Sequence, residues 1–165
     1  MEFETIFIGN ESPYLETLNK LSDLSKVVCE PIQGATRKVF GSAYQFAKEK
    51  KIALVLPSDF IKSPQQADII VVSGYPKRIP YEVIESARIA TVNIHQSLLP
   101  AYRGRHPLNW AIINGETYTG VTIHHINKDF DDGNIILQKR VEILNNDTIM
   151  DVYWKTAKTG CKMLH

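Results

Sequence analysis

Asn93 and His95 place an amide and an imidazole two residues apart in this 165-residue chain. Side chains of a β-strand alternate between its two faces, so in a strand these two would share one face. A hydrogen-bond donor beside an acid–base group suits a reaction that passes through an oxyanion derived from a carbonyl. Such a reaction also needs a carboxylate to orient the imidazole, and Asp131 follows in a polar segment. The three residues are the predicted catalytic set.

Each of these residues also has an ordinary structural explanation when it is taken alone. Asn93 would satisfy backbone groups in a turn, His95 would be a hydrogen-bonded core histidine, and Asp131 would belong to an Asp-Asp-Gly turn. They occur, however, in one order together with a Ser-Leu-Leu-Pro turn at residues 97–100. That combination favours a catalytic site.

The motifs around these residues resemble one known family. Asn-Ile-His-Gln-Ser-Leu-Leu-Pro-Ala-Tyr-Arg-Gly-Arg (93–105) is followed by His-Pro-Leu-Asn-Trp (106–110), Thr-Gly-Val-Thr-Ile-His (119–124) and Asp-Asp-Gly-Asn-Ile-Ile (131–136). In order and spacing they resemble the folate-dependent formyltransferases, which include the methionyl-tRNA, glycinamide ribonucleotide and sugar-amine formyltransferases. The resemblance is good over residues 68–142 and general over the first 67.

The resemblance implies an enzyme, a formyltransferase, and a reaction. The formyl group of the co-substrate 10-formyltetrahydrofolate would pass to a primary amine through a tetrahedral intermediate. Asn93 and His95 would stabilise the oxyanion, and Asp131 would tune His95 and relay protons. Members of the family carry a small residue between the catalytic aspartate and the glycine, whereas this chain has Asp132 there. Asp132 is therefore an alternative, although the spacing to Gly133 favours Asp131.

The same resemblance implies two sets of ligand contacts. The loop after a buried strand and a second wall would bind the folate, and the segment after the Ser-Leu-Leu-Pro turn would border the acceptor amine. The loop after the buried strand could instead be an ordinary strand-to-helix turn. Arg103 would either bind an anionic group of a ligand or stabilise its own segment. The implied folate contacts are Gly74, Tyr75, Pro76, Lys77, Ile126, Asn127, Lys128, Asp129 and Phe130, and the implied acceptor contacts are Ser97, Tyr102, Arg103 and Gly104.

His124 and His125 are adjacent, so in a strand they would face opposite sides and could not share one metal ion. We expect structural roles for both and predict no metal.

The pattern of apolar segments predicts the α/β class, a Rossmann-like, doubly wound, mostly parallel sheet with a shorter β-rich C-terminal half. Apolar runs alternate with amphipathic segments, as in parallel sheets. Ligands of such sheets bind beyond the carboxyl ends of strands, which is where Asn93 and His95 fall. The predicted strands are 5–8, 27–29, 53–56, 69–72, 90–95, 119–126 and 134–141. A first helix is predicted to start at Ser12-Pro13, and three more to cover residues 43–50, 81–86 and 107–114. A last helix would be capped by Asp147 or Thr148.

We expect one formyltransferase catalytic domain over residues 1–165, with a Rossmann-like half over about 1–90 and a catalytic, folate-binding half over about 91–165. The folate would lie in a cleft between the halves. The C-terminal accessory domain of the family is expected to be absent, and a homodimer is left open.

Composition places the chain among ordinary globular proteins, with 44% hydrophobic and 22% charged residues. A net charge of +1 gives no electrostatic footprint for nucleic acid or an anionic membrane. Cys29 and Cys161 are isolated and suggest neither a disulfide framework nor a metal site. The N-terminus lacks the features of a signal peptide, and no apolar run reaches the ~18 residues of a membrane span. We predict a cytoplasmic protein.

The acceptor amine is predicted by comparison among branches of the family. Glu11, in the loop after the first strand, would repel the phosphate of glycinamide ribonucleotide. The basic C-terminal domain of the methionyl-tRNA enzymes is not expected here. Pro107 to Trp110 matches the sugar-amine branch, so a nucleotide-linked amino sugar is the predicted acceptor, and packing is the expected role of Trp110. A methionyl-tRNA enzyme, a 10-formyltetrahydrofolate hydrolase and an inactive remnant are the alternatives.

Overall fold

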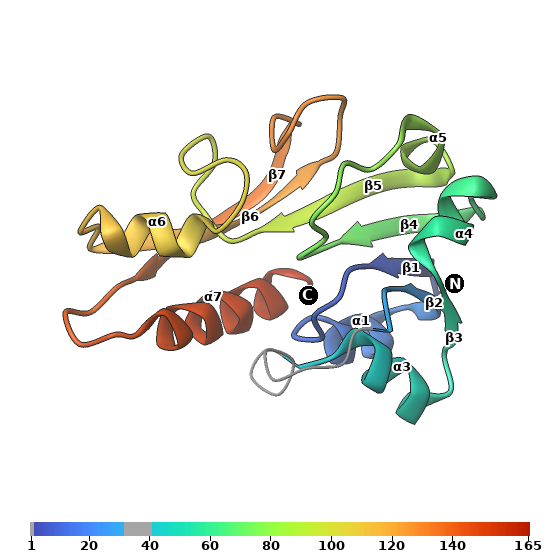
Figure 1. Cartoon of the computed structure of the whole chain (residues 1–165), viewed down its shortest axis with the longest axis horizontal. Coiled ribbons are helices and arrows are strands. Elements are labelled where there is room, and N and C mark those ends of the chain that lie inside the picture. Colours follow the sequence, from blue (N-terminus) through green and yellow to red (C-terminus); the bar gives the residue numbers. More distant parts are fainter. Residues whose placement is uncertain (1, 32–40) are drawn as a thin grey trace. The chain divides into compact units, whose positions relative to one another are not determined.

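Residues 2–31 and 41–165 are described by the computed structural model, in which the chain divides into two compact units, residues 1–92 and 93–165 (Figure 1). The strands of the first unit are β1 (Glu4–Ile8), β2 (Asp23–Val28), β3 (Ala53–Val55) and β4 (Ala67–Val72). β5 (Ala87–His95) begins in the first unit and ends in the second.

The strands of the first unit are parallel where they pair. β1 pairs with β2 on one side and with β4 on the other, and β2 pairs with β3. The chain therefore adds β2 and β3 on one side of β1 and then returns to add β4 on the other side. The carboxyl ends of β1 and β4 lie at this topological switch point, where doubly wound sheets bind ligands. The predicted fold class is confirmed.

The described residues of the first unit form the helices α1 (Leu15–Leu21), α3 (Ala43–Lys50), α4 (Pro57–Lys62) and α5 (Tyr81–Ile84). The helix start predicted at Ser12-Pro13 is wrong, because α1 begins after Tyr14 and no side chain caps it. The Ser12 carbonyl instead accepts a turn hydrogen bond from the Leu15 N–H. β3 was predicted as a buried strand, but its residues are exposed or half-buried because only β2 pairs with it.

The second unit contains α6 (Pro107–Ile113), β6 (Tyr118–His125), β7 (Ile135–Glu142) and α7 (Ile149–Met163). β6 and β7 are antiparallel, with a register shift between Ile123 and His124. Thr148 caps α7 in a capping box with Asp151, which decides between the two predicted caps. α7 contacts α6, β6 and β7 (Figure 1). Among the described residues the strands are hydrogen-bonded in the order β3-β2-β1-β4-β5-β6-β7.

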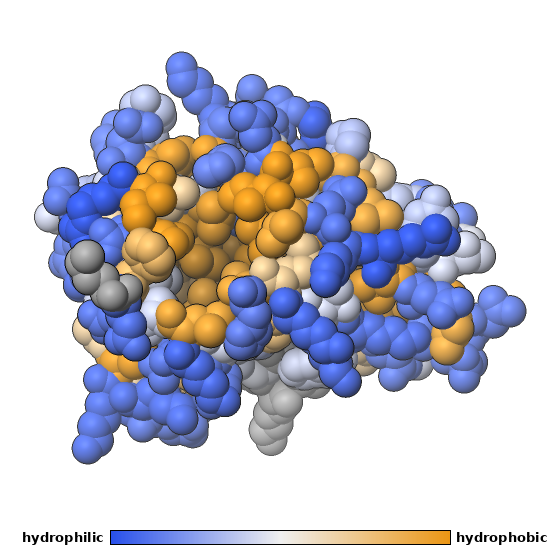
Figure 2. Space-filling view, turned by 180° about the vertical axis from the view of Figure 1, so that it is seen from behind, coloured by the Kyte–Doolittle hydropathy of each residue, from blue (hydrophilic) through white to orange (hydrophobic). Residues whose placement is uncertain are grey.

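Burial in the second unit is uneven. β6 is buried along most of its length, whereas β7 is exposed except at Val141. Figure 2 shows one face of the whole molecule, on which apolar side chains gather at the surface. Trp110 is 54% exposed, so the prediction that it packs inward is wrong. α6 buries Leu108 and Ala111 instead. None of the helices within residues 2–31 and 41–165 combines the length and the hydrophobicity that a bilayer span requires.

Candidate active site

Asn93, His95 and Asp131 converge at the end of β5. Asn93 and His95 occupy alternate positions of the strand, on either side of the buried Ile94. Asp131 comes from the loop that joins β6 to β7. The Asn93 Nδ2 donates to Asp131 Oδ1 over 3.1 Å, and His95 Nδ1 lies 3.6 Å from Asp131 Oδ2. His95 is only 7% exposed, so the amide, the imidazole and the carboxylate form a largely buried polar cluster.

The contacts of His95 assign its two ring nitrogens different tasks. Its Nε2 lies 2.9 Å from the Tyr102 carbonyl oxygen, which can only accept a hydrogen bond. Nε2 therefore carries a proton, and in the neutral ring Nδ1 is left with its lone pair toward Asp131. A proton taken up at Nδ1 would be stabilised by that carboxylate. Nδ1 is consequently the atom through which His95 can exchange protons.

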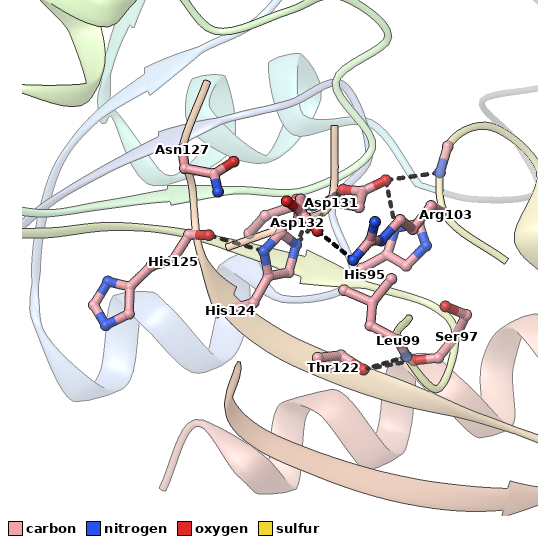
Figure 3. Close-up of polar contacts among 12 residues, drawn as sticks. His95, Ser97, Leu99, Arg103, Thr122, His124, His125, Asn127, Asp131 and Asp132 are labelled. Carbon is pink, nitrogen blue, oxygen red and sulfur yellow. Dashed lines mark hydrogen bonds and ion pairs between the residues drawn. The ribbon is translucent and has the colours of Figure 1, made fainter. Parts of the chain in front are cut away.

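His124 joins this cluster, and the sequence prediction of a purely structural role did not place it there (Figure 3). Its Nε2 lies 3.2 Å from Asn93 Nδ2 and 3.5 Å from Asp131 Oδ1. Its Nδ1 donates to the His125 carbonyl over 2.9 Å, which leaves Nε2 facing Asn93 Nδ2 and Asp131 Oδ1. A histidine near the end of a buried strand that neighbours β5 was the sequence signal that could have indicated this position.

His124 and His125 do face opposite sides of β6, as predicted. His124 is 2% exposed, whereas the His125 side chain is exposed and points away from the cluster (Figure 3). Within residues 2–31 and 41–165, no group of three or more histidine, cysteine or acidic side chains is arranged to hold a metal ion.

Asp131 is held in place by backbone as well as side chains. Its φ of 49° is in the left-handed region, which non-glycine residues rarely adopt. The Gly104 N–H donates to its Oδ2 over 2.8 Å. Gly133, two residues later, leaves no room for a side chain, because a Cβ there would overlap the His125 carbonyl. That carbonyl also accepts from His124, so the shape of this loop and the orientation of His124 are fixed together.

Asp132 points elsewhere. Its carboxylate forms an ion pair with Arg103, and the two side chains are 42% and 45% exposed (Figure 3). Of the two adjacent aspartates, the structure brings Asp131 to the imidazoles.

The Ser-Leu-Leu-Pro turn is tied to the strands beneath it through Thr122 on β6. The Thr122 hydroxyl donates to the Ser97 carbonyl over 2.7 Å and accepts from the Leu99 N–H over 3.2 Å. Gln138 Nε2 on β7 donates to both the Thr122 hydroxyl and the Leu99 carbonyl, each over 2.9 Å. Thr122 and Gln138 were not predicted from the sequence, because an exposed-looking threonine and glutamine carry no signal of this long-range pairing.

The four residues predicted to border the acceptor differ in accessibility. Ser97 is fully buried, and its hydroxyl donates to the Ala101 carbonyl over 2.7 Å, so it shapes the turn instead of presenting a surface. Tyr102 has a φ of 57°, and its hydroxyl donates to Glu116 over 2.6 Å. Arg103 is exposed and paired with Asp132. Gly104 is half-buried and turns its N–H toward Asp131.

Burial and charge act against each other on the pKa values of the cluster. Burial lowers the pKa of His95, and the Asp131 charge and the Tyr102 carbonyl only partly oppose it. Burial acts to raise the pKa of Asp131, but the hydrogen bond with His124, the interaction with His95 and the Gly104 N–H outweigh it and lower that pKa. At neutral pH the site therefore pairs a neutral His95 with an ionised Asp131.

The predicted folate contacts belong to different units. In the first unit, Gly74 follows β4 with a φ of 61°, and a Cβ at Gly9 would overlap the Ser73 carbonyl, so the loops after β1 and β4 touch at the switch point. Tyr75 is half-buried, and burial raises the pKa of its hydroxyl. In the second unit, residues 126–130 begin the loop to Asp131, where the Asp129 N–H donates to Asn127 Oδ1 over 3.0 Å. That the two segments bind one ligand stays a prediction.

Known formyltransferases are similar to this chain in sequence. The sequence profile of the formyl transferase family matches residues 40–165. Methionyl-tRNA formyltransferases of Fusobacterium nucleatum and Acetivibrio thermocellus are 32% and 36% identical, each alignment covering 96% of this chain and 56% of the relative. The chain thus spans about half the length of these relatives.

Solved structures agree in fold. A phosphoribosylglycinamide formyltransferase from Streptococcus pneumoniae TIGR4 superposes with a TM-score of 0.82 at 20% identity, covering 99% of this chain and 95% of that one. WlaRD, a sugar 3N-formyl transferase solved with dTDP and 5-N-formyl-tetrahydrofolate, gives a TM-score of 0.79 at 27% identity, covering 99% of this chain and 60% of that one. The matched profile extends over more than half of the sequence and includes the whole polar cluster, and the chain belongs to the formyl transferase family.

Proposed function

We propose that this protein transfers the formyl group of 10-formyltetrahydrofolate to a primary amine. The observation that carries the proposal is the convergence of Asn93, His95 and Asp131 within one buried cluster, in a chain of the formyl transferase family. An amide donor, a neutral imidazole and an ionised carboxylate are the groups that acyl transfer to an amine requires at neutral pH.

The proposed reaction forms one carbon–nitrogen bond and breaks another. The acceptor amine attacks the formyl carbon, and the carbonyl electrons move to oxygen. Asn93 Nδ2 donates to this oxyanion, for which it must turn one N–H away from its present contact with His124 or Asp131. One such donor is worth roughly 3–4 kcal/mol in acyl transfer.

His95 moves the proton that the attacking amine loses. Nδ1 accepts it, because Nε2 is committed to the Tyr102 carbonyl. Asp131 stabilises the imidazolium so formed from 3.6 Å. The same proton then passes to the folate N10 as its bond to the formyl carbon breaks, so that tetrahydrofolate leaves with an N–H and the ring of His95 returns to neutral.

The co-substrate is assigned to two segments by family resemblance, residues 74–77 and residues 126–130. Two observations support them. Gly74 adopts a left-handed conformation at the switch point of the sheet, where backbone is presented to ligands. Residues 127–130 are exposed and lead directly into Asp131.

A nucleotide-linked amino sugar is the proposed acceptor. The Pro107 to Trp110 segment matches the sugar-amine branch, and 27% identity to a sugar 3N-formyl transferase over nearly the whole chain supports it. The exposure of Trp110 agrees with a role at a surface. Methionyl-tRNA is the second candidate, because the curated relatives at 32% and 36% identity carry that name.

The test is release of tetrahydrofolate from 10-formyltetrahydrofolate with and without candidate amines. The panel contains nucleotide-linked 3-amino and 4-amino sugars and methionyl-tRNA, and mass spectrometry follows the acceptor. We expect release to depend on one amino sugar, which gains the mass of one formyl group. Formylation of methionyl-tRNA alone would replace the sugar with the second candidate. Equal release without any amine would indicate a hydrolase, and no release with any of them would contradict the proposal.

A further inference from the structure

Three consecutive residues of one turn each contact a different group of the site. The Tyr102 carbonyl accepts from His95 Nε2 over 2.9 Å. The Arg103 guanidinium pairs with the Asp132 carboxylate. The Gly104 N–H donates to Asp131 Oδ2 over 2.8 Å. The turn therefore sets both which nitrogen of His95 holds a proton and how Asp131 is oriented.

The two segments joined by these contacts are not held by their own backbone preferences. Tyr102 and Asp131 have φ values of 57° and 49°, and the left-handed region disfavours residues with a side chain. Conformations of this kind persist when surrounding contacts over-determine them. The Arg103–Asp132 pair is a direct side-chain link between the turn and the aspartate loop, one residue away from each strained position.

Global stability does not explain this pair. Its side chains are 45% and 42% exposed, and exposed ion pairs contribute little to folding. Recruitment of an anionic substrate by Arg103 is the other explanation, but the guanidinium already has an anionic partner in Asp132. The contact joins Arg103 Nη2 to Asp132 Oδ1, and a contact between two ionised groups is stronger than one between neutral groups. Such a contact is suited to keeping two loops in register.

We propose that Arg103 and Asp132 are positioning residues, which hold the 102–104 turn against the aspartate loop so that His95 and Asp131 keep their reactive arrangement. The inference rests on the proposed function and adds to it a role for the second aspartate of the Asp-Asp-Gly motif. It also means that an acceptor needs no anionic group at Arg103.

The test uses Arg103→Gln, Asp132→Asn and the charge-reversed double variant Arg103→Asp/Asp132→Arg, with Lys139→Gln as a control that removes an exposed charge of the same unit. Each single variant should lower kcat about 10-fold, as small misplacements of reacting groups do, while KM for the amine and the folate stays within about 2-fold. The double variant should recover most of the loss. The control should match the unaltered protein.

The pH profile separates positioning from charge. Arg103→Gln removes a positive charge and Asp132→Asn removes a negative one, so an electrostatic effect would move the acidic limb of kcat in opposite directions. Lost positioning lowers the plateau in both. If Arg103→Gln instead raised KM for the acceptor with kcat intact, and Asp132→Asn left kcat unchanged, Arg103 would bind substrate and the inference would be wrong.

A second readout does not depend on turnover and keeps this inference separate from the proposed function. The Gly104 amide, which donates to a carboxylate, should have a downfield proton shift and slow hydrogen exchange in NMR spectra. Both single variants should move that proton upfield and speed its exchange, and the double variant should reverse the change. An unaltered Gly104 amide in both single variants would overturn the inference, even in a protein that shows no transfer activity.

Discussion

At the scale of single residues, the chemistry of the site depends on which side-chain atoms already form hydrogen bonds within the protein. His95 has only Nδ1 available for proton exchange, because Nε2 donates to the Tyr102 carbonyl. Asn93 directs its Nδ2 toward both Asp131 and His124. The amide is thus oriented before substrate arrives, and one of its N–H groups must leave its present partner to donate to the oxyanion.

The dependence of turnover on pH follows from His95. Burial lowers its pKa below the ordinary value of 6.5, and the neutral ring is the form that accepts a proton. Activity should therefore be present at neutral pH and fall on acidification, with a midpoint below 6.5 in the kcat/KM profile. Asp131→Asn removes the charge that favours imidazolium, so it should move this midpoint to lower pH and also lower the plateau. A midpoint above 6.5 would contradict the assigned role of His95.

Replacement of the catalytic set should separate the two adjacent aspartates. Asn93→Ala, His95→Ala and Asp131→Ala should each lower kcat by about 10²-fold or more, the effect of losing one oxyanion donor or acid–base group. Asp132→Ala should cost much less, because its carboxylate contacts Arg103. His125→Ala is the matched control, since its side chain is exposed and only its backbone serves the site. Circular dichroism should show that every variant folds.

At the scale of elements, β6 does more than pair with its neighbouring strands, because its side chains also support the site. Thr122 fixes the turn that follows β5, and His124, two residues later, reaches the polar cluster from the same strand. Alternation along a strand places both side chains on one face. Gly120 precedes them on that face, and a Cβ there would overlap Leu98 of the turn and the Lys139 carbonyl.

The Thr122 hydroxyl should matter for stability. Thr122→Val removes it and leaves the buried Leu99 N–H and Ser97 carbonyl without this partner. Unsatisfied buried groups cost roughly 1–3 kcal/mol each, so the free energy of unfolding should fall by at least that amount in urea denaturation. Thr122→Ser keeps the hydroxyl and should lose much less. Equal losses in the two variants would show that the methyl group, not the hydrogen bonds, is what the fold requires.

Element prediction succeeded where local pattern and tertiary environment agree. α3 covers the predicted residues 43–50, and Ser42 accepts from the Gln45 N–H as a helix cap. It failed at Ser12, whose carbonyl makes a turn before α1 begins. Apolar composition could not show that β3 is an edge strand, because strand order is not encoded in the strand itself. α4 was missed, since six residues carry too little periodicity.

At the scale of the whole molecule, binding of the co-substrate is the property to measure. If residues 74–77 and residues 126–130 both contact the folate, 5-formyltetrahydrofolate should raise the Tm of the chain. A ligand at 100 times its Kd stabilises the folded state by about 2.7 kcal/mol. Gly74→Ala, which strains a left-handed position, and Asn127→Ala, which removes the Asp129 contact, should each reduce the shift. A shift in the unaltered protein that neither variant reduces would place the folate elsewhere.

The sequence by itself determined the fold class, the family resemblance and the positions of Asn93, His95 and Asp131, because alternation in strands and the order of motifs are local properties that residue types record. Tertiary structure alone decided that His124 enters the cluster, that Asp132 pairs with Arg103, and that Ser97 is buried. These depend on contacts between residues far apart in the chain. Such contacts are set by the packing of strands and turns against one another, and the local pattern of residue types does not specify that packing.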